Sequence, residues 1–127
     1  MVFSIVKNMK LLGLRSLIYP TDDLHADIKW WSKIIGNKPY FETEDYAGFS
    51  VGGYEIGLFP AGKMEDGAIT YIGVESVPTA YNQLLNEGCV AHEEPVEVGG
   101  GIAMASVKRP NGQIVGVIYN PNFKIKE

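Results

Sequence analysis

Two short segments of this chain follow the same pattern, and their match constrains the fold more than any other feature. The later segment, Val107–Pro121, carries two apolar runs on either side of an Arg-Pro-Asn-Gly turn. Proline presets φ in a tight turn and glycine tolerates the left-handed conformation that closes it, so the segment predicts a β-hairpin. The earlier segment, Phe49–Pro60, predicts a similar hairpin around a Gly-Gly turn. Aligning the two turns places Gly57 on Gly116, which indicates two copies of one unit.

The segments before the first hairpin predict a strand, a helix and a short strand. Leu11–Tyr19 reads as a strand, and apolar residues recur at helical spacing over 24–35. Thr21 or Asp22 is expected to cap this helix. Pro39–Thr43 is predicted as a short strand before the hairpin.

The second half repeats this order. Ala68–Glu75 predicts a strand, and Ser76 is expected to cap a helix with an apolar face over 77–85. Cys89–Glu94 is a strand candidate, and the closing hairpin begins at Ile102. Each half is therefore expected to be β-α-β-β-β, with its helix packed on its own sheet.

Length and composition favour one ordinary globular unit. The 127 residues are expected to form a single domain, 1–127, made of modules at about 11–60 and 68–121. The net charge of −4, without a Lys/Arg cluster, argues against nucleic acid as a partner. A single cysteine excludes an internal disulfide. The sequence has neither an apolar run of the ~20 residues that a membrane span needs nor a recognisable leader at its start, so a cytoplasmic protein is expected.

These features resemble the vicinal oxygen chelate superfamily, which includes glyoxalase I, extradiol dioxygenases, and fosfomycin and bleomycin resistance proteins. The resemblance rests on the paired modules, on the opening SLIYPTDDLHADIKWWSKIIG and on the closing VGGGIAMASVKRPNGQIVGVIYNP. The closing phrase is similar to the family's Asp-Pro-Asp-Gly-Asn hairpin, with Arg109 in place of the first Asp. The resemblance implies an α+β fold in which two tandem βαβββ modules form a curved mixed sheet around a concave cleft.

The resemblance also implies where metal ligands would lie, on the first and last strands of each module. Carried over by position, these sites fall on Ser16, Gly57, Ile69 and Gly116. Three of the four have no side-chain donor, so we predict no metal and no other cofactor. The two histidines, His25 and His92, form no pair with metal-ligand spacing. They are expected to be exposed or locally hydrogen-bonded.

Strand alternation predicts the residues that face the concave cleft and bind a ligand there. They are Ser16, Ile18, Glu55, Gly57, Phe59, Ile69, Tyr71, Met104, Ser106, Ile114, Gly116 and Ile118. Most are apolar, as in typical small-molecule sites. Glu55 is either a carboxylate for the ligand or a solvated charge at a strand edge. Gly57 and Gly116 are expected to leave space for a ligand or for close strand approach, so that leucine in place of Gly116 would be tolerated.

Taken together, these observations favour a metal-independent protein that binds a small organic ligand, in the manner of the bleomycin resistance proteins. A homodimer is expected, since exposed sheet edges and apolar surfaces need covering. The alternative is an enzyme, either a glyoxalase-like lyase or isomerase or a dioxygenase-related protein. Glu55 and Tyr71 are the acid–base groups that an enzyme would have in the cleft. A dimerising domain with a filled cavity is a third possibility.

Overall fold

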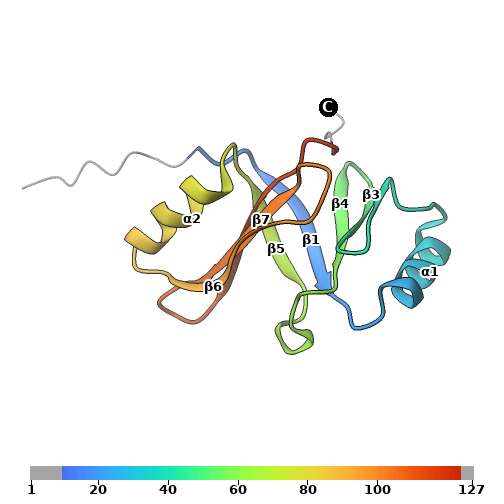
Figure 1. Ribbon diagram of the computed structural model, residues 1–127, viewed down its shortest axis with the longest axis horizontal. Helices are drawn as coiled ribbons and strands as arrows, with labels where there is room; N and C mark the ends of the chain where they lie inside the picture. The colour runs from blue at the N-terminus through green and yellow to red at the C-terminus, as the bar shows by residue number, and fades with distance from the viewer. Residues whose placement is uncertain (1–9, 124–127) are drawn as a thin grey trace, which may run out of the picture.

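A computed structural model describes residues 10–123 of the chain; residues 1–9, in which no leader is expected, and residues 124–127 lie outside the described part. The elements are β1 (Leu14–Pro20), α1 (Leu24–Ile35), β2 (Phe41–Glu42), β3 (Ala47–Val51), β4 (Tyr54–Phe59), the 3₁₀ turn η1 (Met64–Asp66), β5 (Ile69–Gly73), α2 (Val77–Asn86), β6 (Val90–Glu97), β7 (Ala103–Lys108) and β8 (Ile114–Tyr119). Figure 1 shows the two helices at opposite ends of the molecule with the sheet between them.

All eight strands form one mixed sheet in the order β2-β3-β4-β1-β5-β8-β7-β6. The first strands of the two halves, β1 and β5, pair antiparallel at its centre, with Ser16 opposite Tyr71. On its other side, each first strand pairs in parallel with the last strand of its own half, β1 with β4 and β5 with β8. The predicted α+β fold, with two βαβββ units on one curved mixed sheet, is confirmed.

The helices cover one face of the sheet, and their caps follow the sequence closely. The α1 side packs on a cluster centred on Phe49 and Leu58, and α2 packs on β7 and β8. Ser76 caps α2 as predicted, and its hydroxyl accepts from the backbone N–H of Thr79. The cap of α1 was predicted one or two residues too early. Asp23 is the N-cap, and its carboxylate accepts from the backbone N–H of Ala26.

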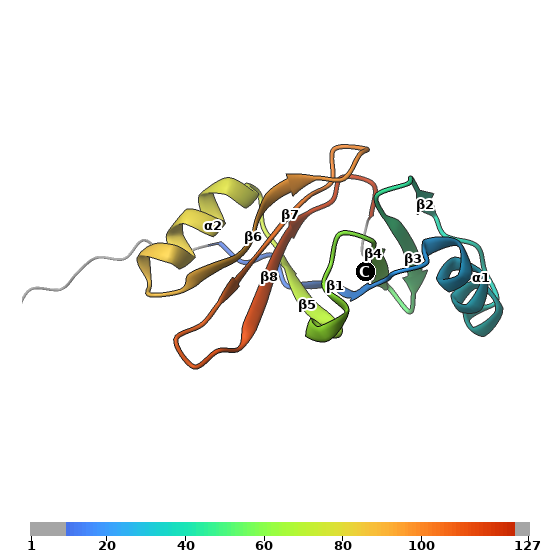
Figure 2. The same ribbon diagram turned by 60° about the horizontal axis from the view of Figure 1, so that its bottom comes forward.

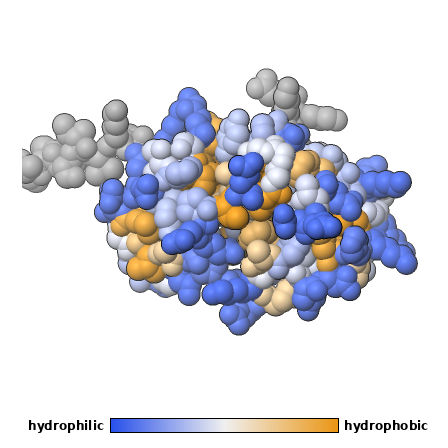
Figure 3. All heavy atoms as spheres, in the orientation of Figure 1, coloured by the Kyte–Doolittle hydropathy of each residue, from blue (hydrophilic) through white to orange (hydrophobic). Residues whose placement is uncertain are grey.

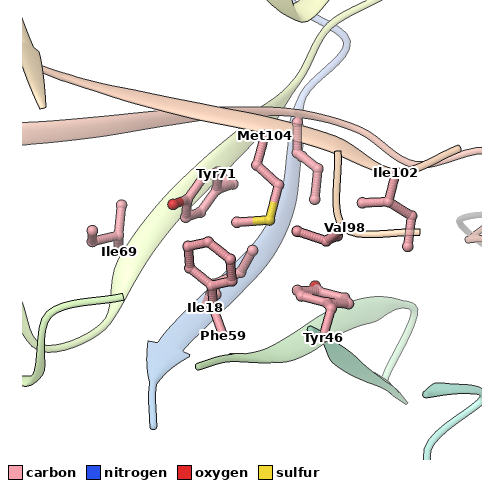
Figure 4. Close-up of a cluster of buried hydrophobic side chains, with 9 residues drawn as sticks. Ile18, Tyr46, Phe59, Ile69, Tyr71, Val98, Ile102 and Met104 are labelled. Carbon is pink, nitrogen blue, oxygen red and sulfur yellow. The ribbon is translucent and has the colours of Figure 1, made fainter. Parts of the chain in front are cut away.

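The opposite, concave face is filled by a second core, in which aromatic and aliphatic side chains from both halves meet (Figure 4). Its members are Ile18, Tyr46, Phe59, Ile69, Tyr71, Val98, Ile102, Met104 and Ile118. These residues come from β1, β4, β5, β7, β8, the segment before β3 and the loop between β6 and β7. The two halves are therefore joined by shared packing as well as by strand pairing.

The loop between β6 and β7 reaches across the sheet to the first half (Figure 2). Its ends, Val98 and Ile102, are buried in the shared core, and the hydroxyl of Thr43 donates to the backbone oxygen of Val98 at 3.2 Å. The three glycines between them all have positive φ, from 61° to 103°. Such conformations strain other residues, so this tight crossing depends on the glycine run. Within residues 10–123, no helix is long and apolar enough to cross a membrane.

Candidate functional site

The twelve residues predicted to line the cleft do gather on the concave face, but they do not surround an open space. All of them except the half-buried Ile114 are buried, most against one another and against the β6–β7 loop. The prediction of their common face was correct. The expectation of an open apolar cavity at this position was wrong, because the protein's own side chains occupy it.

The two matched glycines explain how the cleft is filled. A Cβ on Gly57 would lie 2.8 Å from Cζ of Tyr46, and one on Gly116 would lie 2.6 Å from Cε2 of Tyr71. In each half, a tyrosine ring therefore lies directly on the glycine of the last strand. The space above these glycines, predicted to be open for a ligand or for close strand approach, holds a phenol ring. Leucine in place of Gly116 would clash rather than be tolerated.

Glu55 is the centre of a buried polar cluster on the same face. The side chain is 1% exposed, so the alternative of a solvated charge at a strand edge is wrong. The Tyr46 hydroxyl donates to its carboxylate at 2.8 Å, and the Asn120 amide donates at 3.1 Å. The hydroxyls of Ser16 and Tyr40 donate to it as well. The carboxylate thus receives four donors, three from the first half and one from beyond β8.

Burial controls the charge state of this cluster. Removal from water raises the pKa of Glu55 above its ordinary value of 4.5, while the hydrogen bonds from Ser16, Tyr40, Tyr46 and Asn120 act in the opposite direction. Burial also raises the pKa of Tyr46 and Tyr40, and the nearby charge of Glu55 adds to that effect. The phenols therefore keep their protons and remain donors. A carboxylic acid with a raised pKa is suited to proton exchange or to binding a hydrogen-bonding ligand.

The raised pKa of Glu55 predicts a pH dependence of stability. A carboxyl group whose pKa is higher in the folded protein stabilises the fold below the unfolded value, and this contribution is lost as pH rises through the folded value. We therefore expect the wild type to lose stability relative to Glu55→Gln as pH rises from about 4.5 through the folded pKa of Glu55. Urea unfolding of both proteins across this range is the measurement. A constant difference between them would contradict a raised pKa.

A second polar cluster lies on the same face in the other half. His92 Nδ1 is 2.7 Å from the hydroxyl of Ser106, and Nε2 is 2.8 Å from a carboxylate oxygen of Asp66. Ser106 also donates to Glu93 at 3.1 Å. The side chain of His92 is 4% exposed, whereas His25 is exposed on α1. His25 is therefore exposed, and His92 is hydrogen-bonded, so each histidine matches one of the two predicted alternatives.

The residues present do not fit the metal site that the fold implies. Strand pairing sets Glu55 beside Ser16 and Tyr71 beside Gly116, so the residues that lie side by side differ from the four positions carried over from the family. Among Ser16, Glu55, Tyr71 and Gly116, only Glu55 has a carboxylate. Its oxygens already accept hydrogen bonds from four donors. Within residues 10–123, no three His, Cys, Asp or Glu side chains form a group that could hold a metal ion.

Two open grooves lie near Glu55, one on each face of the sheet. A hollow of about 640 Å³ lies next to Tyr40 and the turn between β3 and β4, and its lining is Asn37, Lys38, Tyr40, Ser50, Gly52 and Gly53. A more apolar groove of about 400 Å³ lies at the beginning of β1 and β4, mainly on the helix-bearing face, where Leu17 pairs with Ile56 and Thr70. Its lining is Leu14, Arg15, Ser16, Leu17, Val51, Tyr54, Glu55, Ile56 and Thr70. Space for a small molecule is therefore present beside the cluster and not over the matched glycines.

The sequence did not identify three members of the cluster. Tyr40, Tyr46 and Asn120 were not among the residues predicted to line the cleft. The signal available for Tyr46 was Gly57, because a glycine inside a strand often marks a place where another group approaches closely. Nothing in the sequence indicated that Asn120 reaches Tyr40 at 2.8 Å across the sheet.

Comparisons with known proteins agree with this architecture. No protein-family model matches the chain, and no curated protein matches its sequence. Solved structures do match: a methylmalonyl-CoA epimerase from Mycobacterium tuberculosis has 15% identity over 92% of this chain and 93% of that one, with a TM-score of 0.65. A methylmalonyl-CoA epimerase in complex with methylmalonyl-CoA and NH4+ has 12% identity, a TM-score of 0.67 and coverage of 92% and 100%. An Mn(II)-bound glyoxalase from Novosphingobium aromaticivorans has 18% identity and a TM-score of 0.61, covering 94% of this chain and 42% of that one.

These matches define a class of fold. The chain has the vicinal oxygen chelate fold, also called the glyoxalase-like fold, as its sequence predicted. Some proteins with this fold are enzymes, and identities of 11–18% establish the shared architecture and not a shared reaction.

Proposed function

We propose that this protein binds a small organic molecule beside the Glu55 cluster, without a metal ion. The observation that carries the proposal is the contact between a buried, four-donor carboxylate and an open hollow of about 640 Å³, with Tyr40 belonging to both. The hydroxyl of Tyr40 is oriented by Glu55 and by Asn120, and its ring forms part of the wall. A preorganised polar group at the edge of a concave space is a common feature of ligand sites.

The lining of the hollow favours a polar or amphipathic ligand. Lys38 brings a cation, Asn37 and Ser50 bring neutral hydrogen-bonding groups, and the Gly52-Gly53 turn exposes backbone. The acidic loop that contains Glu44 and Asp45 follows the short strand β2 at the edge of the sheet. These groups support binding of a molecule that both accepts and donates hydrogen bonds.

A fragment screen by protein-detected NMR tests this proposal. We expect fragments that bind to shift the amide signals of Tyr40, Ser50 and Lys38. Tyr40→Phe is expected to lower their affinity about fivefold, which corresponds to the loss of one neutral hydrogen bond. Tyr54→Phe is the matched control, because that side chain is 56% exposed and no hydrogen bond of its hydroxyl is found within residues 10–123. Fragments that bind elsewhere, or that bind Tyr40→Phe as well as the wild type, would refute the proposal.

A proton-transfer enzyme is the second candidate function, and the charge state of Glu55 favours it. Burial raises the pKa of its carboxyl group, which brings an acid closer to the range where general acid–base catalysis is efficient. Such an isomerase would exchange a hydrogen next to a carbonyl group with solvent. Deuterium incorporation from D₂O into a panel of 2-oxo acids and thioesters, lost in Glu55→Gln, would distinguish this enzyme from a binding protein.

We also propose that the protein is a homodimer. Exposed apolar side chains are found on β1, β4 and α1, including Leu14 at 58%, Tyr54 at 56% and Ile34 at 59% exposure. In the view of Figure 3, apolar side chains reach the surface in several groups among polar ones. Burying such groups in a symmetric interface would stabilise a pair of chains. Light scattering at micromolar concentration is expected to give twice the 13.9 kDa chain mass, and a single-chain mass would refute the dimer.

A further inference from the structure

The central strand pair contains an irregularity that changes the direction of one side chain. Leu14 lies opposite Ile72 and Ser16 lies opposite Tyr71, so Arg15 is an extra residue in β1. A β-bulge of this kind places two consecutive side chains against one on the partner strand. Arg15 is thereby turned to the same face as Ser16, which is the concave face that carries the Glu55 cluster.

Gly73 shows where the side chain of Arg15 goes. A Cβ on Gly73 would lie 2.7 Å from Cγ, 2.8 Å from Nε and 3.1 Å from Cζ of Arg15. The arginine therefore lies flat across the glycine at the end of β5. The bulge and the glycine, on two different strands, together hold one cationic side chain in a fixed place.

The charge held there has no partner among residues 10–123. No carboxylate of these residues forms an ion pair with Arg15, and its guanidinium makes no hydrogen bond to them. Glu55, one strand away, is occupied by its four donors. The chain's other arginine, Arg109, is exposed and donates to Gln113 at 2.7 Å. A half-buried arginine without an anionic partner is unusual in a folded protein.

We propose that Arg15 binds the anionic group of the ligand, a carboxylate or a phosphate. The planar guanidinium offers parallel N–H donors that fit two oxygens of such a group, and it is already positioned before the ligand arrives. The next residue of β1, Ser16, donates to Glu55, so Arg15 adjoins the polar cluster that borders the hollow at Tyr40. This inference rests on the proposed function and narrows its ligand to a small organic anion.

Nitrogen-15 NMR of the arginine side chains tests the inference directly, because the chain has two arginines and gives two Nε signals. The probes are phenyl phosphate and benzoate as anions, benzyl alcohol as a neutral analogue, and inorganic phosphate. We expect the Arg15 signal to shift saturably with the two organic anions while the Arg109 signal stays fixed. Phenyl phosphate and benzoate separate a phosphate site from a carboxylate site, and inorganic phosphate measures the contribution of the organic portion.

Variants make the outcome decisive. Arg15→Gln is expected to weaken binding of the organic anions about 10- to 100-fold, the range for a charge-assisted contact, and to leave benzyl alcohol unchanged. Gly73→Ala is expected to weaken binding of the organic anions to a similar extent, because the new methyl group displaces Arg15. Arg109→Gln is the matched control and is expected to leave binding of the anions unchanged. Circular dichroism and melting temperature confirm that each variant is folded.

Two failures are distinguishable. Equal shifts of both arginine signals, or unchanged binding of the anions to Arg15→Gln, would overturn the role of Arg15. In that case, binding of benzyl alcohol near Tyr40 would leave the proposed function intact. If no probe binds the wild type, the inference and the proposed small-molecule function both fail.

Discussion

Replacing Gly57 with alanine is expected to lower the free energy of unfolding by about 3–5 kcal/mol. The new methyl group would lie 2.8 Å from Cζ of Tyr46 and closer still to its hydroxyl, so the ring must move. Overpacking of this kind costs about 1–3 kcal/mol. Moving the ring also breaks its 2.8 Å hydrogen bond to Glu55, and bonds to charged groups contribute about 1.5–3 kcal/mol. Urea unfolding monitored by tryptophan fluorescence is the measurement.

Two controls separate this clash from the general cost of replacing a glycine. Gly53→Ala has positive φ but no atom within 4 Å of the new methyl group, so it is expected to cost about 1–2 kcal/mol from backbone strain alone. In a double-mutant cycle, Tyr46→Phe removes the hydroxyl oxygen that lies nearest to the new methyl group. Gly57→Ala is then expected to lower the free energy of unfolding by less than it does in the wild type. Equal costs at Gly57 and Gly53 would contradict the packing of Tyr46 described above.

Replacing Glu55 with alanine is expected to destabilise the protein by about 4 kcal/mol. The substitution removes the acceptor shared by Ser16, Tyr40, Tyr46 and Asn120 and leaves their donors without a partner. Buried donors left unpaired cost about 1–3 kcal/mol each, and some of this is recovered as hydroxyl groups rotate towards one another. The same urea experiment measures the effect.

Glu55→Gln is the matched control for this prediction. Its amide oxygen still accepts, and the hydroxyl groups around it can accept from its N–H₂ group, so a loss of only about 1–2 kcal/mol is expected. Because the carboxyl group of the wild type has a raised pKa, the difference from Glu55→Gln should also shrink at high pH. If alanine and glutamine have the same effect, the four hydrogen bonds do not stabilise the fold.

The architecture could be predicted from the sequence because it repeats itself. Two turns and two capped helices at matched positions set the element order, and alternation along the strands gave the correct face for Ser16, Glu55 and Tyr71. These are local properties, which depend on neighbours a few residues away. The error at α1 arose where three possible capping residues, Thr21, Asp22 and Asp23, stand in a row, and Asp23 is the one that caps the helix.

The interior of the cleft could not be predicted in the same way. Alternation states which face a residue occupies, but it does not state what lies opposite. A glycine on the concave face is compatible with an empty pocket and with a ring packed on it, and here Tyr46 and Tyr71 take that place. The direction of Arg15 was equally hidden, since a bulge reverses the alternation from which its position would be read.

The crossing contacts determine when the site can form as the chain folds. Glu55 and its amide donor Asn120 are 65 residues apart, Tyr40 and Asn120 are 80 apart, and Thr43 and Val98 are 55 apart. Contacts over such distances require loops to close before they contribute, which makes them late events in folding. During synthesis, the first half leaves the ribosome with its carboxylate lacking the amide donor that follows β8. The polar centre of the first half is completed only by Asn120, which follows the last strand of the second half.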